Sequence, residues 1–172
     1  MAQAQRGDKD SFSTLIRRHL DALFTYAMRL THSTVSAEDL VQETCLAAWQ
    51  HAARYRPSKA KVTTWLHKIL HNKFIDGVRK AAPEYDENVV ATALAHGSTD
   101  EEVMHMQAQD RLLKLIGNLP VNQKSAILLT YMQGFNNREV AQIMNISTRA
   151  LESLLARARN GLKERLGRKR YD

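Results

Sequence analysis

The charge pattern divides the chain into two basic parts and an acidic one, and this division constrains the fold most strongly. Residues 1–80 carry a net charge of +6 and residues 104–172 one of +7, whereas residues 81–103 carry −6 and no basic residue. The acidic segment contains Pro83 and Gly97 and shows no strong apolar period, which is typical of a linker. The alternative is a loop within one domain, but structureless loops of this length are uncommon in compact domains. The sequence therefore predicts two small domains joined by a flexible acidic linker.

Both basic parts show the patterning of α-helices, so the predicted fold class is all-α. The chain has only 3 prolines and 7 glycines, and alternating apolar stretches typical of strands are scarce. Apolar residues recur every three or four positions from about Asp10 to Thr31, which predicts one amphipathic helix. A second helix is expected to begin at Ser36, whose hydroxyl would cap it, and a third near Val62 or Thr63.

The second part begins with two predicted helices that end at glycines. The stretch "MQAQDRLLKLIGNL" is helical in pattern, with Gly117-Asn118 as its stop and Pro120 beyond it. The next helix, "NQKSAILLTYMQG", is expected to end at Gly134.

The closing third of the chain has the pattern of a helix-turn-helix. Asn136 and Glu139 have capping-box spacing at the start of a short helix. Asn145 stands where a turn needs a left-handed residue, and Ser147 or Thr148 would cap the next helix. On that helix the stripe expected to be buried is formed by Leu151, Leu154, Leu155, Ala158 and Leu162. Its polar face would be free to enter a DNA major groove, although an αα-hairpin in a bundle would show the same stripe.

Three stretches, taken together, resemble one known family. "AEDLVQETCLAAW" (37–49) is similar to the core-polymerase-binding helix of bacterial sigma-70-type factors of the extracytoplasmic-function (ECF) group. "TTWLHKILHNKFIDGVRK" (63–80) resembles the −10 element helix of that group, and residues 119–166 resemble its −35-binding domain. The order of these stretches and the acidic linker also match.

The resemblance implies both a domain assignment and a function. Residues 1–80 would form a sigma region 2 helical bundle, and residues 104–172 a sigma region 4 helix-turn-helix domain. The chain would bind core RNA polymerase, direct it to a promoter through the −10 and −35 elements, and help to open the duplex. The alternative is a helix-turn-helix regulator that never acts as a sigma subunit, but it would leave the stretch 37–49 unexplained.

The expected polymerase contacts are Asp39, Gln42 and Glu43. They lie at i, i+3 and i+4 and therefore share one face of a helix. An acidic and amide face on a basic domain suits basic and polar groups of the polymerase. The alternative is that Asp39 caps the helix and Glu43 is merely solvated.

The expected −10 contacts lie in the loop "YRPSKAK" (55–61) and on the helix after it. A melted base needs a pocket and a stacking surface outside the duplex, and the family places that pocket at this loop. Trp65 is the candidate for stacking, although a tryptophan in a helical stripe is more often part of a core. The predicted set is Lys59, Lys61, Trp65, Lys68, His71, Asn72, Arg79 and Lys80.

The expected −35 contacts are Ser147, Thr148, Arg149, Glu152, Ser153 and Arg157. The chain departs from the family here, because Arg149 stands where a Gly-Thr-Val step usually begins and Glu152 where a basic residue is usual. A glutamate can accept a hydrogen bond from the N4 amine of cytosine in the major groove. We therefore hypothesise that Glu152 reads a cytosine. The alternative is a solvated glutamate paired with Arg149 or Arg159.

Other classes of function find little support in the residues. The single cysteine, Cys45, rules out an internal disulfide and a cysteine-based zinc site. His67 and His71 have a spacing that a metal could use, but no third ligand is evident. No phosphate-binding glycine loop or nucleophile motif occurs. The sequence therefore predicts no catalytic residue, no metal, no cofactor and no enzymatic activity.

The expected setting is the cytoplasm. The N-terminus has no apolar region of the kind a secretory signal needs, and no apolar run approaches the roughly 20 residues of a membrane helix, so no membrane insertion is expected. Besides core RNA polymerase and promoter DNA, the resemblance implies an anti-sigma factor as a partner.

Overall fold

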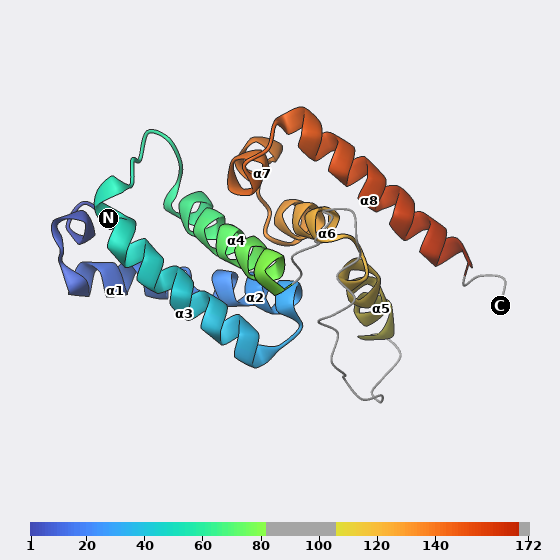
Figure 1. The fold of residues 1–172 in the computed structure, drawn as a ribbon, viewed down its shortest axis with the longest axis horizontal. Coiled ribbons are helices and arrows are strands. Elements are labelled where there is room, and N and C mark those ends of the chain that lie inside the picture. The colour runs from blue at the N-terminus through green and yellow to red at the C-terminus, as the bar shows by residue number, and fades with distance from the viewer. Residues whose placement is uncertain (82–105, 169–172) are drawn as a thin grey trace.

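The computed structural model describes residues 1–81 and 106–168, and these two ranges are helical without a strand (Figure 1). The first range contains α1 (Lys9–Arg17), α2 (Leu20–Thr31), α3 (Thr34–His51) and α4 (Val62–Ala81), with short 3₁₀ turns at Ala4–Arg6 and Ala52–Arg54. The second contains α5 (Met106–Gly117), α6 (Val121–Ile127), α7 (Asn137–Met144) and α8 (Thr148–Arg168). The all-α prediction is confirmed for these ranges. The segment predicted as a linker, 81–103, lies outside the described residues except for Ala81.

The prediction of one helix from Asp10 to Thr31 is wrong, because the chain turns between α1 and α2. Asp8 caps α1 and accepts hydrogen bonds from the amides of Asp10 and Ser11, at 3.0 and 3.1 Å. Ile16 in α1 and Leu23 in α2 are both buried in the same core. The turn keeps the apolar stripe in register, so the spacing of apolar residues did not reveal it.

The prediction that Ser36 caps α3 is also wrong by three residues. His32 ends α2 in the left-handed conformation (φ 54°), and the chain then extends at Ser33. The Ser33 hydroxyl accepts a hydrogen bond from the Ser36 amide at 3.3 Å. Both Ser33 and Ser36 are residues that can cap a helix. Because α2 ends at His32, α3 can begin directly after Ser33, which therefore becomes the cap.

The other predicted helix limits are close to those observed. Helix α4 begins at Val62, and α5 ends at Gly117. Helix α6 continues as a π-helical turn, Leu128–Met132, before the chain turns at Gly134 with a φ of 71°. Glycine adopts this left-handed conformation without steric cost, which explains why the helix stops there.

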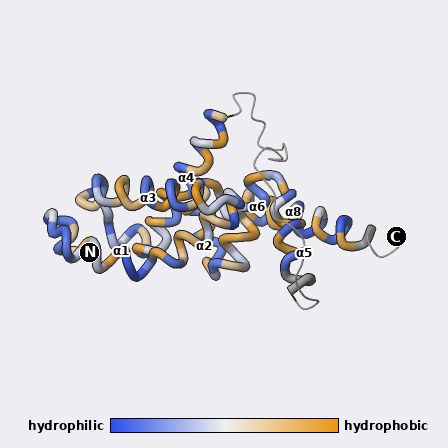
Figure 2. Tube along the Cα trace, turned by 90° about the horizontal axis from the view of Figure 1, so that it is seen from below, coloured by the Kyte–Doolittle hydropathy of each residue, from blue (hydrophilic) through white to orange (hydrophobic). Residues whose placement is uncertain are grey.

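The helices pack as two groups that share one hydrophobic cluster. In the first group, α2, α3 and α4 surround Leu23, Tyr26, Leu66 and Leu70, all fully buried. In the second, α6 and α7 pack on α8. Figure 2 shows hydrophobic and hydrophilic residues interspersed along the helices of both groups. Helix α4 also packs against α7, and the cluster of buried residues runs through both groups. We call this contact between the groups the seam.

Several polar side chains are buried at the seam. Lys124 of α6 is only 3% exposed, and its Nζ donates to the Leu30 carbonyl of α2 at 3.0 Å. Burial lowers the pKa of Lys124 to about 8. The His67 ring of α4 lies between the rings of Tyr26 and Phe135, with centroids 5.7 and 4.8 Å away. The seam therefore joins the two groups by polar as well as apolar contacts.

His71 lies one helical turn beyond His67 and is also buried. Its ring is 3% exposed, and its Nδ1 lies 3.2 Å from the Tyr26 hydroxyl. Burial lowers the pKa of His71 from the ordinary 6.5 to about 4. The ring is therefore neutral in the folded protein near neutral pH.

Acid is expected to destabilise the protein through His71. The unfolded chain binds the proton near pH 6.5 and the folded protein only near pH 4, so stability is complete above pH 6.5 and falls as the pH drops toward 4. The difference corresponds to about 3 kcal/mol in the free energy of unfolding. We expect urea denaturation to show this loss in the wild type and a smaller loss in His71→Leu. His51→Gln, at an exposed position, is the control and should follow the wild type. Equal pH dependence in wild type and His71→Leu would contradict the assignment.

Candidate functional site

Helix α3 presents one polar face to solvent. Asp39, Gln42 and Glu43 are all exposed, as their shared face predicts. Two large apolar side chains, Val35 and Leu46, extend the same face and are 69% and 58% exposed. The sequence reasoning missed these two, although exposed valine and leucine on a helix with its own buried stripe are a usable signal for a contact surface.

A groove of about 690 Å³ runs between α3 and the end of α4 and includes part of this polar face. Asp39 and Glu43 line it from α3, and Lys73 and Phe74 from α4. The Lys73 Nζ donates to Glu43 Oε2 at 3.1 Å. Glu43 is exposed and Lys73 is partly exposed in this ion pair, and pairs at the surface contribute about 1 kcal/mol or less. A charged partner can therefore replace Lys73 at little cost.

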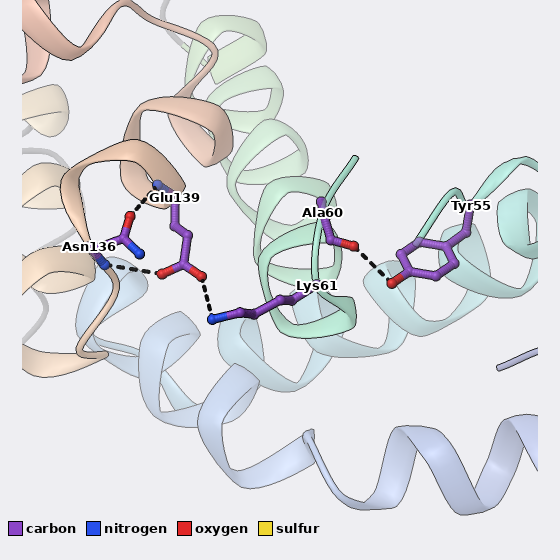
Figure 3. Close-up of polar contacts among 5 residues, drawn as sticks. All are labelled: Tyr55, Ala60, Lys61, Asn136 and Glu139. Carbon is purple, nitrogen blue, oxygen red and sulfur yellow. Dashed lines mark hydrogen bonds and ion pairs between the residues drawn. The ribbon is translucent and has the colours of Figure 1, made fainter. Parts of the chain in front are cut away.

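The loop before α4 forms a pocket of about 350 Å³ with basic groups on its walls. The Tyr55 hydroxyl donates to the Ala60 carbonyl at 2.8 Å and closes the loop on itself (Figure 3). Trp65 is half-buried, packs on the Tyr55 ring at 5.1 Å, and lines the pocket together with Lys59 and Lys68. The structure thus brings an indole surface and two cationic side chains to one hollow.

The remaining predicted −10 residues divide between surface and core. Lys61, Asn72, Arg79 and Lys80 are exposed. His71 is buried, so the prediction that it contacts DNA is not supported in this arrangement. Helix α4 is covered on two sides, by α2 and α3 and by α7, and His71 faces the interior between them.

The helix-turn-helix geometry of α7 and α8 is confirmed. Asn136 Oδ1 accepts from the Glu139 amide at 3.0 Å, and Glu139 Oε2 accepts from the Asn136 amide at 3.1 Å, which forms the capping box of α7. Asn145 is left-handed at φ 55°, as the turn requires. The Ser147 hydroxyl then accepts from the Ala150 amide at 3.1 Å. The turn is therefore built from local hydrogen bonds.

Helix α8 turns its leucines inward and its polar residues outward. Leu151, Leu155, Ala158 and Leu162 are buried, whereas Leu154 is only partly buried. All six predicted −35 residues are exposed: Ser147, Thr148, Arg149, Glu152, Ser153 and Arg157. The stripe that was expected to be core is therefore core except at Leu154, and the polar face is available at the N-terminal end of the helix.

Glu152 carries no hydrogen bond or ion pair to the described residues. Arg159, one of its two possible partners, donates from Nη1 to the Tyr131 hydroxyl at 3.2 Å. The solvated pair of Glu152 with Arg149 or Arg159 is therefore not found in the described part of the chain. The Glu152 carboxylate is available for an external donor.

Comparison with known proteins identifies the family. Residues 15–84 match Sigma-70 region 2, and residues 109–162 match Sigma-70, region 4. The ECF RNA polymerase sigma factor SigM of Bacillus subtilis is 31% identical over 150 residues, covering 87% of this chain and 91% of SigM. The chain belongs to the ECF RNA polymerase sigma factors. SigM of Mycobacterium tuberculosis H37Rv is also 31% identical, over 94% of this sigma factor and 80% of the relative.

Two solved structures have the same fold, and one of them is named as a sigma factor. RpoE of Bartonella quintana, crystallised with the anti-sigma factor NepR, matches with a TM-score of 0.71 and 28% identity over 91% of this sigma factor and 97% of that chain. CnrH, solved with the cytosolic domain of CnrY, also matches with a TM-score of 0.71. Its identity is 27%, over 96% of this sigma factor and 94% of the CnrH chain. Both alignments extend over both helical groups.

The predicted function is therefore confirmed at the level of the family. This ECF sigma factor binds core RNA polymerase and directs promoter-specific transcription initiation. A helix-turn-helix regulator of another class would leave the match of residues 15–84 to region 2 unexplained.

Two further findings concern the described residues of this sigma factor. None of their helices is long and apolar enough to cross a membrane. In the same ranges no group of three histidine, cysteine, aspartate or glutamate side chains is placed to hold a metal.

Proposed function

We propose that this sigma factor contacts its partners through three separate surfaces of the two domains. Residues 1–80 form the region 2 domain, which carries the polymerase face on α3 and the −10 surface at the loop 55–61 and α4. Residues 104–172 form the region 4 domain, which carries the −35 surface on α8. Residues 81–103 link them. The observation that supports this most strongly is that the matched regions 15–84 and 109–162 each present an exposed face of suitable chemistry.

The polymerase face combines charge with apolar area. Asp39, Gln42 and Glu43 supply acceptors and an amide, and Val35 and Leu46 supply exposed apolar area on either side. Specific interfaces typically have an apolar centre and a polar rim. Basic groups of core polymerase would displace Lys73 from Glu43 and pair with the acidic side chains.

The −10 surface is proposed to hold a melted base in the pocket beside Trp65. Extrusion of a base costs a few kcal/mol, and stacking on an aromatic ring offsets about 1–3 kcal/mol of this. Lys59 and Lys61 would neutralise phosphates of the displaced strand. Lys68 and Asn72 line the same pocket, and Arg79 and Lys80 continue the basic surface along α4.

The −35 surface is proposed to read bases with the first turns of α8. Ser147, Thr148 and Ser153 offer hydroxyls, and Arg149 and Arg157 are suited to guanines or phosphates. Glu152 would accept from a cytosine amine, because its carboxylate is exposed and without a partner in the described residues.

We also propose that an anti-sigma factor holds this protein inactive. Of the solved structures that it resembles, one contains the sigma factor RpoE bound to the anti-sigma factor NepR, and another contains CnrH bound to the cytosolic domain of CnrY. The polymerase carries out the chemistry of transcription, so the sigma factor itself needs no catalytic activity. Because core polymerase is the partner, we place its action in the cytoplasm.

Run-off transcription with purified core polymerase and genomic promoter fragments tests the function as a whole. The sigma factor is expected to give promoter-specific transcripts that core polymerase alone does not give. If no fragment yields a transcript with core polymerase that is active with another sigma factor, the proposed function fails.

Glu43→Lys is expected to weaken binding to core polymerase at least tenfold. The change replaces an acceptor by a like charge facing basic groups, and tenfold corresponds to about 1.4 kcal/mol. Fluorescence anisotropy with labelled sigma factor and titrated core measures it. Asp21→Lys, the same charge reversal on the exposed side of α2, is the matched control and should bind as the wild type does. If both variants bind core polymerase with equal affinity, α3 is not part of the interface.

Trp65→Leu is expected to slow promoter opening about tenfold or more, because leucine keeps apolar volume but offers little stacking surface. Opening is followed by permanganate reactivity of the −10 thymines, and a template with a pre-melted −10 bubble should restore transcription. If Trp65 serves only as core, the variant instead loses free energy of unfolding and opens promoters at the normal rate once folded.

Glu152→Ala is expected to abolish a preference for cytosine at one −35 position. One good base contact discriminates by about 1–3 kcal/mol, so the preference lost is at least several-fold. Binding of the holoenzyme to promoters carrying each base at each −35 position measures it. Glu164→Ala removes the same charge from a more distal exposed position of α8 and serves as the control. An unchanged base preference in Glu152→Ala would refute the hypothesis.

A further inference from the structure

Residues 3–8, which we call the N-terminal segment, contact the start of the loop to which we assign −10 recognition. They include the 3₁₀ turn Ala4–Arg6, which packs against the 3₁₀ turn Ala52–Arg54 directly before that loop. In Figure 1 the N mark lies beside the end of α3, where the loop begins. The segment precedes residues 15–84, the range matched by region 2, so the family match assigns it no role.

Hydrogen bonds within the N-terminal segment and to α1 fix its position. Gly7 is left-handed at a φ of 88°, and its amide donates to the Ala4 carbonyl at 3.1 Å. The Asp8 amide donates to the Gln3 carbonyl at 3.3 Å, and the Asp8 side chain caps α1. The Ser11 hydroxyl of α1 lies 2.9 Å from Gln3 Oε1 and can donate to it. The segment is therefore tied to the first turn of α1.

Helix α1 is in turn anchored to α3. The Phe12 ring meets the Trp49 ring edge-on, with centroids 5.0 Å apart. Ile16, one turn further along α1, is buried in the core of the first group. Trp49 lies one turn before Ala52–Arg54, so this contact fixes α1 close to the point where the loop begins.

One side chain of the N-terminal segment bonds the backbone of the loop. Gln5 Nε2 donates to the Tyr55 carbonyl at 2.7 Å, across 50 positions of the sequence. Tyr55 is the residue at which the chain leaves the turn Ala52–Arg54 and becomes extended. Because the bond is partly buried, water can only partly replace the amide donor if Gln5 is changed.

Tyr55 connects this bond to the proposed base pocket. Its hydroxyl donates to the Ala60 carbonyl at 2.8 Å (Figure 3), and its ring lies 5.1 Å from the Trp65 ring. Tyr55, Ala60 and Trp65 line the pocket of about 350 Å³, whereas Gln5 does not. Gln5 thus holds the start of the loop, and Tyr55 contacts both the far end of the loop and the indole. A shift of Tyr55 would therefore change the shape of the pocket.

A pocket binds an extruded base more tightly when its walls are already in place. A loop that becomes ordered only on binding loses conformational entropy at that moment, which weakens the affinity. Extrusion of a base is itself unfavourable, and the contacts in the pocket have to offset it. A hydrogen bond that fixes the loop beforehand therefore favours capture of the base without touching it.

We propose that the N-terminal segment holds the −10 pocket in its binding shape, and that Gln5 is a positioning residue that acts through Tyr55 and Trp65. This inference rests on the proposed function of the loop 55–61. Promoter opening would then depend on a part of the chain that lies outside both matched regions.

Gln5→Met in the holoenzyme tests this role. Methionine keeps the length and volume of the side chain but has no donor for the Tyr55 carbonyl. Anisotropy compares a single-stranded −10 oligonucleotide with copies made abasic at one position at a time. The wild type is expected to lose about tenfold in affinity when the base that enters the pocket is removed, because a stacked base is lost. Gln5→Met is expected to bind the intact oligonucleotide about threefold more weakly, and that abasic copy as the wild type does. General destabilisation would instead weaken both alike.

Arg6→Met is the matched control, because it makes the same substitution product at the neighbouring, exposed position of the same turn. Loss of the Arg6 charge acts on both oligonucleotides alike, so the ratio of the two affinities should equal that of the wild type. Tyr55→Phe keeps the ring beside Trp65 but loses the bond to Ala60, and is expected to weaken binding of the intact oligonucleotide only. Because Gln5 acts through Tyr55, Gln5→Met/Tyr55→Phe is expected to lose less than the product of the two single losses.

Three results would overturn the positioning role. They are an unchanged ratio of affinities in Gln5→Met, an equal change in Arg6→Met, and independent losses in the double variant with Tyr55→Phe. Each would show that the bond to the Tyr55 carbonyl does not act on the pocket.

Hydrogen exchange in the free sigma factor separates this inference from the proposed function. The amides of Tyr55 and Lys59 donate to the carbonyls of Ala52 and Arg56 at 3.1 and 3.0 Å. They are expected to exchange about threefold faster in Gln5→Met, and equal exchange would overturn the role of Gln5 whatever the DNA result. If the wild type loses no affinity at any abasic position, the proposed base pocket fails, and faster exchange still shows that Gln5 fixes the loop.

Discussion

The packing of α4 against helices on two sides is the contact on which the rest of the structure depends. Leu66 and Leu70 point into the bundle with α2 and α3, while His67 faces Phe135 of the second group. Helix α4 therefore completes the core of the first group and also packs against the second group. Because α4 also carries the proposed −10 residues, the position of the second group decides whether those residues can meet DNA.

Some contacts at the seam stabilise the packing of the two groups, and others oppose it. Burial of apolar side chains favours this packing by about 25 cal/mol for each Å² removed from water. The buried ammonium of Lys124 opposes it, and burial depresses the pKa of that amine for the same reason.

Local patterns were sufficient for most of the individual elements and failed at a few particular places. The capping box of Asn136 and Glu139 and the left-handed Asn145 were predictable, because they depend on neighbours within a few residues. The break at Arg18-His19 was missed because the turn preserves the apolar spacing. His71 was assigned to DNA with the other polar residues of the helix that resembles the −10 element helix, and only the neighbouring helices show that it faces inward.

The sequence alone determined the all-α class, the helix-turn-helix, the buried leucines of α8, and the family to which the chain belongs. The first three follow from spacing or from short-range hydrogen bonding, and the family follows from the resemblance of whole stretches of the chain. Only the tertiary structure decided which surfaces are open. The acidic face of α3 is exposed and free of the second group, whereas Lys61, although exposed, pairs with Glu139, more than seventy positions away in the sequence. Contacts at that separation depend on how whole helices pack, and no local pattern in a sequence encodes them.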